Sequence, residues 1–208
     1  MLKFIPILAL IFLVPLTAKA QTAIEEMPAG VYTLDKTHAS LTWKVSHLGL
    51  SNYTARFKDF DATIDFKPDA VEDSVLTVTV NPASVETDYL YPEKKDFNKK
   101  LAESEKWFNS TEFPEITFTS NKLIRDLENA NTGVIEGELN FLGQSHPLTL
   151  DVVFNGATKV HPFANVPAMG FSATTTLDRT LWELDIYAPN IGKDVTLLIE
   201  VEFHKTDE

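Results

Sequence analysis

The sequence predicts an all-β fold with one short helix, in which about eight antiparallel strands form a single extended barrel. From residue 30 onward most segments alternate apolar and polar residues with a period of two, and only the stretch 96–108 has apolar residues near helical spacing. No proline- or serine-rich linker and no block of charge divides residues 30–205, which indicates one domain. The pattern is typical of barrels and sandwiches, and closure into a barrel is favoured because a long open sheet leaves unpaired edges.

Four segments in the first half of this domain have strand patterns. Residues 31–34 form one candidate strand, and residues 40–47 alternate cleanly, with an apolar row that ends at His47. Residues 55–66 alternate more weakly and contain several aromatic side chains. Their expected partner is the segment 75–80, in which every second residue is Leu or Val.

The helix is predicted over residues 96–108, among Lys, Glu, Ala and Asn residues. Its apolar residues near helical spacing are Phe97, Leu101 and Phe108. Pro114 marks a stop after this region, because the residue before a proline is driven out of the helical conformation. Alternation resumes in residues 116–120, which are predicted to form a strand.

The last third of the chain contains four more strand segments. Residues 132–141 and 148–154 alternate regularly, and Gly143 between them predicts a hairpin turn. Residues 170–179 form the next candidate strand. The segment 195–203 has the cleanest alternation of the chain and is predicted to be the last strand.

Arg179 ends an otherwise apolar strand face, because Phe171, Ala173 and Leu177 precede it at even spacing. A guanidinium group keeps its proton in a protein, so at the end of a buried face it must meet a carboxylate, a carbonyl or an anionic ligand group. Its partner is either a ligand head group or a structural group of this chain, and a bulge that turns Arg179 outward is the third alternative. His47 has the same position on its own strand and is the second candidate for a polar rim.

Aromatic side chains are frequent in the predicted strands, where they either fill the barrel or line a hollow one. The residues predicted to line a ligand pore are Trp43, Val45, Phe57, Phe118, Phe141, Phe171 and Leu177. Sequence alone leaves both alternatives open for this set.

The first 20 residues fit a secretory signal peptide, since Lys3 precedes an apolar stretch and the expected cleavage follows Ala20. Residues 21–29 are expected to be a flexible lead-in. The apolar stretch is too short to span a membrane, and no later segment reaches about 20 consecutive apolar residues, so no integral membrane anchor is expected. The expected location is the periplasm or the outside of the cell.

Composition and motifs exclude several classes of function. The chain has 30 acidic and 18 basic residues and a net charge of −12, which disfavours nucleic acid as a partner. It has no cysteine, so disulfides and thiolate catalysis are excluded. No hydrolase motif or phosphate-binding glycine loop is present, so the chain is not expected to be an enzyme. The five histidines lack metal-ligand spacing, and neither a metal site nor a cofactor is expected.

Four segments together resemble the YceI family of lipocalin-like, polyisoprenoid-binding extracytoplasmic proteins: 32–40, 43–49, 113–120 and 170–179. The match extends from about residue 30 to residue 203. The resemblance implies a lipocalin-like barrel with the helix beside it and a long apolar pore for an isoprenoid chain, such as a quinone or a prenyl phosphate tail. It implies binding for transport, storage or sequestration.

The chain departs from the family pattern at the end of the pore where a head group would lie. Glu183 stands where the family has a glycine, next to the aromatic Trp182, and Lys100 stands where the family often has a histidine. The acidic net charge favours a neutral, quinone-like head group over a diphosphate.

Two other functions stay open at this point. One is an extracytoplasmic stress-response or interaction module with a packed barrel and no lipid. The other is an enzyme that acts on an amphipathic substrate, for which Ser120 with His47 is the pair to test. The oligomeric state is not predicted, and a dimer is compatible with the sequence.

Overall fold

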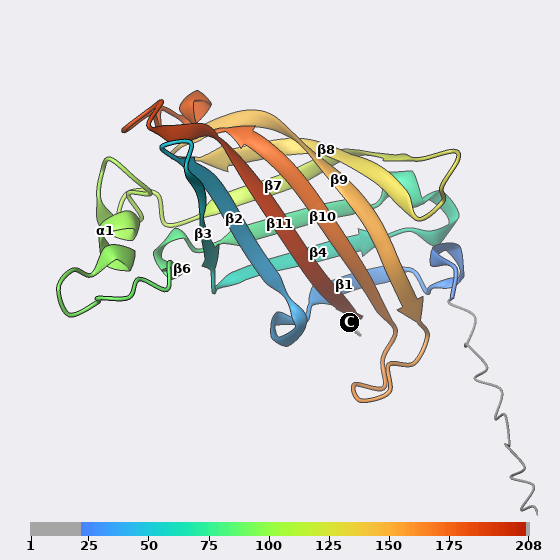
Figure 1. Cartoon of the computed structure of the whole chain (residues 1–208). Helices are drawn as coiled ribbons and strands as arrows, with labels where there is room; N and C mark the ends of the chain where they lie inside the picture. The colour runs from blue at the N-terminus through green and yellow to red at the C-terminus, as the bar shows by residue number, and fades with distance from the viewer. Residues whose placement is uncertain (1–21, 207–208) are drawn as a thin grey trace, which may run out of the picture.

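The computed structural model describes residues 22–206, and the predicted signal peptide lies outside this part of the chain. Within it, all strands belong to one antiparallel sheet (Figure 1). The strands are β1 (Gly30–Leu34), β2 (Ser40–His47), β3 (Ser51–Phe57), β4 (Phe60–Phe66), β5 (Val75–Val80), β6 (Val85–Glu86), β7 (Ile116–Arg125), β8 (Thr132–Phe141), β9 (Gln144–Thr158), β10 (Ala168–Asp178) and β11 (Ile191–Lys205). One α-helix, α1 (Phe97–Glu103), is accompanied by the 3₁₀ turns η1 (Ile24–Glu26), η2 (Lys36–His38), η3 (Pro68–Asp73), η4 (Pro82–Ser84) and η5 (Arg179–Trp182).

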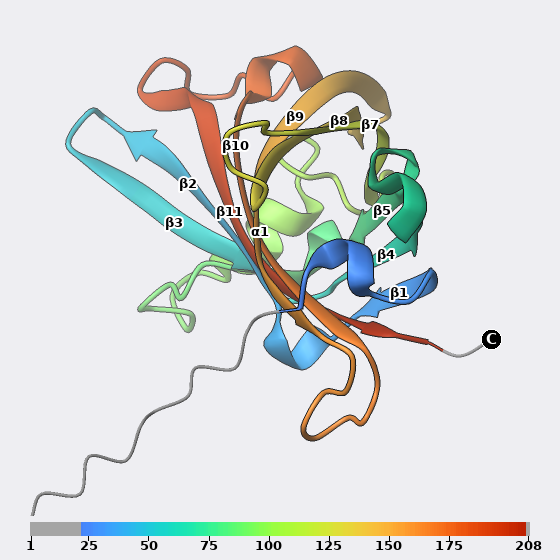
Figure 2. The same cartoon turned by 90° about the vertical axis from the view of Figure 1, so that its right-hand side faces the viewer.

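Eight of these strands close into a ring, in the order β1-β4-β5-β7-β8-β9-β10-β11 (Figure 2). Closure depends on the end of β11, where Phe203 pairs with Leu34 and Lys205 pairs with Tyr32 of β1. The earlier half of β11 pairs instead with β2, which carries β3 and β6 beyond the ring. The predicted all-β barrel of about eight antiparallel strands is therefore confirmed.

The observed elements differ from the predicted ones where polar side chains interrupt the pattern. The segment 55–66 is two strands, because the backbone N–H of Asp59 bonds the Ser84 hydroxyl at 3.0 Å and ends β3 in a turn. The helix is shorter than the predicted range 96–108. It begins after Asp96, whose carboxylate accepts a hydrogen bond of 2.9 Å from the Lys99 N–H, and it ends at Glu103, with Ser104 as its C-cap.

Residues 104–109 fold back after α1 in tight turns. The N–H of Phe108 bonds the carbonyl of Leu101 at 3.0 Å, which brings the Phe108 ring into the core, 5.4 Å from the ring of Phe57 and 6.0 Å from that of Phe141. The α1 segment thus packs at one end of the barrel, beside β6 (Figure 1).

The opposite end of the barrel is filled by side chains. Tyr32, Phe66, Met169 and Phe203 are all at most 2% exposed there. Met27, within the segment expected to be a lead-in, is also 2% exposed, and Glu25 makes an ion pair of 2.6 Å with Arg125 of β7. The sequence pattern did not predict these contacts.

Gly137 of β8 is required by the core, because the Phe118 ring of β7 lies directly over its backbone. A Cβ at position 137 would lie 2.5 Å from Cζ of Phe118 and would also meet the Thr119 carbonyl. We expect Gly137→Ala to lower the free energy of unfolding by about 1–3 kcal/mol, since overpacked cores lose stability to this extent.

Urea unfolding followed by tryptophan fluorescence measures this change. Gly170→Ala is the matched control, because its Cβ would come no closer than 3.8 Å to another heavy atom. Equal stability of the two variants would contradict this explanation of the glycine.

Candidate functional site

The interior of the barrel contains an apolar cavity of about 680 Å³ at the α1 end. A second cavity of about 120 Å³ lies toward the other end. Four side chains line both cavities and mark the place where they meet: Leu41, Val78, Leu150 and Ile199. The larger volume is typical of ligand sites in proteins, which run from about 300 to 1,000 Å³.

Six of the seven residues predicted to line a pore line the larger cavity: Trp43, Val45, Phe57, Phe118, Phe141 and Leu177. Strand alternation turns these side chains inward, which is why the sequence could identify them. Phe171 lines the smaller cavity instead, where its ring lies 6.1 Å from that of Phe203. Their contact with a ligand stays a prediction.

The α1 segment and three loops supply lining residues that the prediction of the pore missed. Phe97, Leu101 and Phe108 could have been found from their helical spacing. Tyr89 and Tyr187 lie in loops with no periodic pattern, so no sequence signal marked them. Aromatic side chains from outside the strands thus complete the wall.

Three polar side chains of the larger cavity, His47, Lys95 and Lys100, are exposed to solvent and therefore lie where the cavity opens, which we call its mouth. Two apolar side chains of the neighbouring segments are also exposed, Leu50 in the β2–β3 turn at 84% and Leu90 before α1 at 81%. Neither of these two leucines lines the cavity itself.

Ser120 and His47 do not form a catalytic pair. Ser120 lines the smaller cavity, and its hydroxyl accepts a hydrogen bond of 2.8 Å from the N–H of Leu76. His47 lines only the larger cavity. The structure thus separates the two groups that the enzyme alternative required to be adjacent.

Arg179 also lines the larger cavity, but its side chain is only 3% exposed. It does not continue the face of β10 as predicted, because β10 ends at Asp178 and Arg179 begins η5. The Asp178 carboxylate caps that turn at the Thr180 N–H, 3.0 Å away.

The Arg179 guanidinium donates hydrogen bonds to four backbone carbonyls, two in the loop before β11 and two in the first residues of β11. Nε bonds Gly192 at 2.8 Å, Nη2 bonds Ile186 at 3.0 Å and Ile191 at 2.9 Å, and Nη1 bonds Leu184. Burial lowers the pKa of Arg179 below its ordinary value, although an arginine remains charged at neutral pH. Four of its five N–H groups are thus occupied by the chain itself, and its role toward a head group stays a prediction.

Trp182 and Glu183 lie at the end of η5, where the chain enters this loop. Trp182 is 1% exposed, and its indole N–H donates to the Gln144 carbonyl at 3.0 Å. Glu183 has φ 59° and ψ 14°, a left-handed conformation that favours glycine. The backbone thus keeps a left-handed conformation at position 183 although the residue is Glu.

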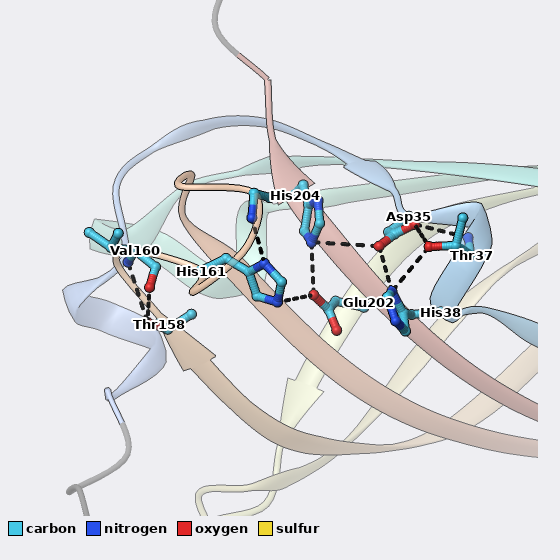
Figure 3. Close-up of polar contacts among 9 residues, drawn as sticks. Asp35, Thr37, His38, Thr158, Val160, His161, Glu202 and His204 are labelled. Carbon is cyan, nitrogen blue, oxygen red and sulfur yellow. Dashed lines mark hydrogen bonds and ion pairs between the residues drawn. The ribbon is translucent and has the colours of Figure 1, made fainter.

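A second polar cluster lies on the outer surface near the filled end of the barrel (Figure 3). His161, Glu202 and His204 place one ligand-type atom each within 4.8 Å of the others. His204 Nε2 lies 2.7 Å from Glu202 Oε1 and 3.8 Å from Asp35 Oδ2. His161 and Asp35 are far in the sequence from Glu202 and His204, so residue spacing did not reveal the cluster.

Hydrogen bonding accounts for this cluster better than metal ligation does. The backbone N–H of Ala164 donates to His161 Nδ1 at 3.1 Å, so the ring proton of neutral His161 lies on Nε2. The Nε2–H group of His161 then faces Glu202 Oε1, and the two atoms Nε2 and Oε1 are 3.3 Å apart. A metal-binding histidine shows the opposite polarity, with a lone pair on the ligating nitrogen and a proton on the other.

Comparisons with known proteins place the chain among relatives of the same fold. The family model described as "YceI-like domain" matches residues 32–203. A UPF0312 protein of Pseudomonas putida is 33% identical over 152 residues, which cover 72% of this chain and 74% of that protein. Protein YceI of Shigella flexneri is 29% identical over 176 residues, covering 84% and 86%.

Solved structures agree with this assignment. The YCEI protein of Campylobacter jejuni is 28% identical and has a TM-score of 0.66, with 79% of this chain and 91% of that one covered. A polyisoprenoid binding domain from Saccharophagus degradans has a TM-score of 0.59 at 14% identity, covering 84% and 98%, which shows a common fold.

We expect Arg179→Lys to lower the free energy of unfolding by about 3 kcal/mol or more. A lysine cannot reach four carbonyls with one ammonium group, and buried carbonyls without donors cost stability. Urea unfolding measures the loss. Arg56→Lys, at a side chain that is 52% exposed, is the control and should change the stability by less than about 0.5 kcal/mol. A small effect at position 179 would show that the carbonyl bonds do not hold the loop.

The Asp35–His38 pair predicts a pH dependence of stability. The two side chains meet at 2.7 Å, which raises the pKa of His38 and lowers that of Asp35. The His38 contribution is present below its ordinary pKa of 6.5 and is lost as the pH rises through the raised value. The Asp35 contribution is present above its ordinary pKa of 3.8 and is lost as the pH falls through the lowered value. The pair therefore stabilises most between these two ordinary values.

Asp35→Asn tests this dependence, because an Asn side chain still accepts the Thr37 N–H that Asp35 accepts at 2.9 Å. We expect the stability difference between the wild type and Asp35→Asn to be larger at pH 5.5 than at pH 8.5 in urea unfolding. An equal difference at both pH values would contradict the role of the ion pair.

Proposed function

This chain belongs to the YceI-like family, and we propose that its barrel binds an amphipathic lipid with a polyisoprenoid tail, such as an isoprenoid quinone or a prenyl phosphate. The observation that carries this proposal is the apolar cavity of about 680 Å³ inside a closed barrel. The polyisoprenoid binding domain from Saccharophagus degradans has the same fold, which supports the choice of tail.

The arrangement of the two cavities supports an elongated tail. The cavities border on each other at the four side chains that they share, so a tail that enters beside α1 and moves these side chains aside would extend along the barrel toward Phe171. Each buried methylene-sized group contributes about 0.8 kcal/mol, so ten of them supply ~8 kcal/mol before ordering costs. That energy corresponds to roughly micromolar binding. The tail is therefore the main source of affinity.

We further propose that binding serves transport, storage or sequestration in the periplasm or outside the cell. The predicted signal peptide of residues 1–20 supports this location, although it lies outside the described residues. Within residues 22–206 no helix is long and apolar enough to cross a membrane. The alternative of a packed barrel without a ligand does not account for the volume of the larger cavity.

Leu150→Trp tests the proposed path of the tail. Leu150 is 6% exposed and lines both cavities, so an indole ring there narrows the place where they meet. We expect this variant to bind a C40 isoprenoid alcohol at least tenfold more weakly than the wild type, while a C10 alcohol is much less affected. Displacement of a fluorescent apolar probe measures both affinities.

Leu198→Trp on β11 is the control, because Leu198 is 40% exposed and lines neither cavity. It should bind both alcohols as the wild type does. Equal affinity of Leu150→Trp and Leu198→Trp for the C40 alcohol would contradict the proposed path. A wild type that binds no isoprenoid at all would overturn the proposed function.

A further inference from the structure

The charged side chains that line the larger cavity are all basic. Lys95, Lys100 and Arg179 line it together with His47, whereas no Asp or Glu does. This asymmetry contrasts with the whole chain, in which 30 acidic residues outnumber 18 basic ones. The sign of charge at the cavity is therefore opposite to that of the protein.

The two lysines are available to a ligand. Among residues 22–206, neither Lys95 nor Lys100 has a carboxylate oxygen within 4.0 Å of its ammonium nitrogen, and Lys95 Nζ lies 4.7 Å from the Phe97 ring. The neighbouring Lys99, by contrast, pairs with Glu103 at 3.8 Å and does not line the cavity. Two ammonium groups without a carboxylate partner thus belong to the cavity wall.

A third donor lies deeper along β2. The indole nitrogen Nε1 of Trp43 is buried and has no hydrogen-bond partner within the described residues. An indole N–H and an ammonium group can only donate, so a ligand atom that binds any of these three groups must be an acceptor. A buried N–H without an acceptor costs stability that a ligand oxygen would recover.

We infer that the lipid held in this cavity carries an anionic head group, a phosphate or a carboxylate, bound between Lys95, Lys100 and His47 at the mouth. This inference rests on the proposed function. Phosphate and carboxylate oxygens accept hydrogen bonds without donating, and their charge is opposite to that of the lysines. Arg179 adds positive charge at the cavity wall, although four of its five N–H groups are occupied by backbone carbonyls.

The basic residues of the cavity favour an anionic head group, whereas the negative net charge of the chain favours a neutral one. The distance of each charge from the head group decides which effect is larger. Salt screens charges beyond about 8 Å at physiological ionic strength, so remote carboxylates contribute little at the mouth. The acidic groups that act on Arg179 are Asp178 and Asp185, neither of which lines the cavity, and Asp178 is paired with Lys193 at 2.6 Å. We therefore revise the expectation of a neutral head group, which was based on net charge alone, to an anionic head group.

Three C20 lipids with the same tail test this inference: geranylgeraniol, geranylgeranoic acid and geranylgeranyl phosphate. We expect the phosphate and the acid to bind at least tenfold more tightly than the alcohol in 50 mM salt, and this preference to shrink in 500 mM salt. Competition with inorganic phosphate at millimolar concentration should weaken the two anions more than the alcohol.

Lysine variants test which side chains cause the preference for anionic lipids. In the double variant Lys95→Ala/Lys100→Ala the preference for the anions should fall to less than threefold, whereas Lys99→Ala, on the same helix, should keep it. Equal binding of all three lipids by the wild type would overturn the inference and leave the proposed function intact. An equal loss in Lys99→Ala would overturn the assignment to the cavity mouth. Binding of none of the three would overturn the proposed function itself.

Discussion

Closure of the sheet between β1 and β11 is the constraint on which the rest of this structure depends. Only the last residues of β11 pair with β1, while its earlier part pairs with β2. Because the ring is closed, its backbone groups are paired with neighbours, and the inward side chains can be apolar along its whole length. An eight-stranded ring is wide enough for its inward side chains to leave space, and that space becomes the cavity beside α1.

The two ends of the barrel have different roles that follow from their side chains. At one end large residues such as Tyr32 and Phe66 meet at a ring separation of 5.8 Å and fill the interior. Outside this end the Asp35–His38 pair and the histidines of β11 and its neighbouring loop join segments distant in the sequence (Figure 3). At the other end α1 and three loops complete an apolar wall without filling it.

The sequence predicted most of the fold and the main wall of the cavity, because period-two alternation identifies both strands and inward side chains. Trp43 and Phe118 could be identified in this way. The carbonyl groups that accept from Arg179 could not be predicted, because any residue type can supply a backbone carbonyl. The segment that supplies them lies 5–13 positions after Arg179 in the sequence. The surface contact of His161 with Glu202 could not be predicted either, since it depends on the pairing of β10 with β11 and on the conformation of the loop before β10. Lys100 was identified from the sequence as a departure from the family pattern. Its positive charge could be related to a ligand only once the structure showed that Lys100 lines the cavity.

The four carbonyl bonds of Arg179 make the two sides of the cavity mouth mechanically unequal. The side formed by residues 184–192 is held at several points by one buried side chain, so it cannot open in part without breaking a set of bonds together. The side formed by residues 88–95 is anchored at its start by Asn98, which accepts from Thr87, and beyond that mainly by ring contacts such as Tyr89 with Phe97. The segment 88–95 is therefore the more easily displaced side of the mouth, and we expect a ligand of the proposed kind to enter past it.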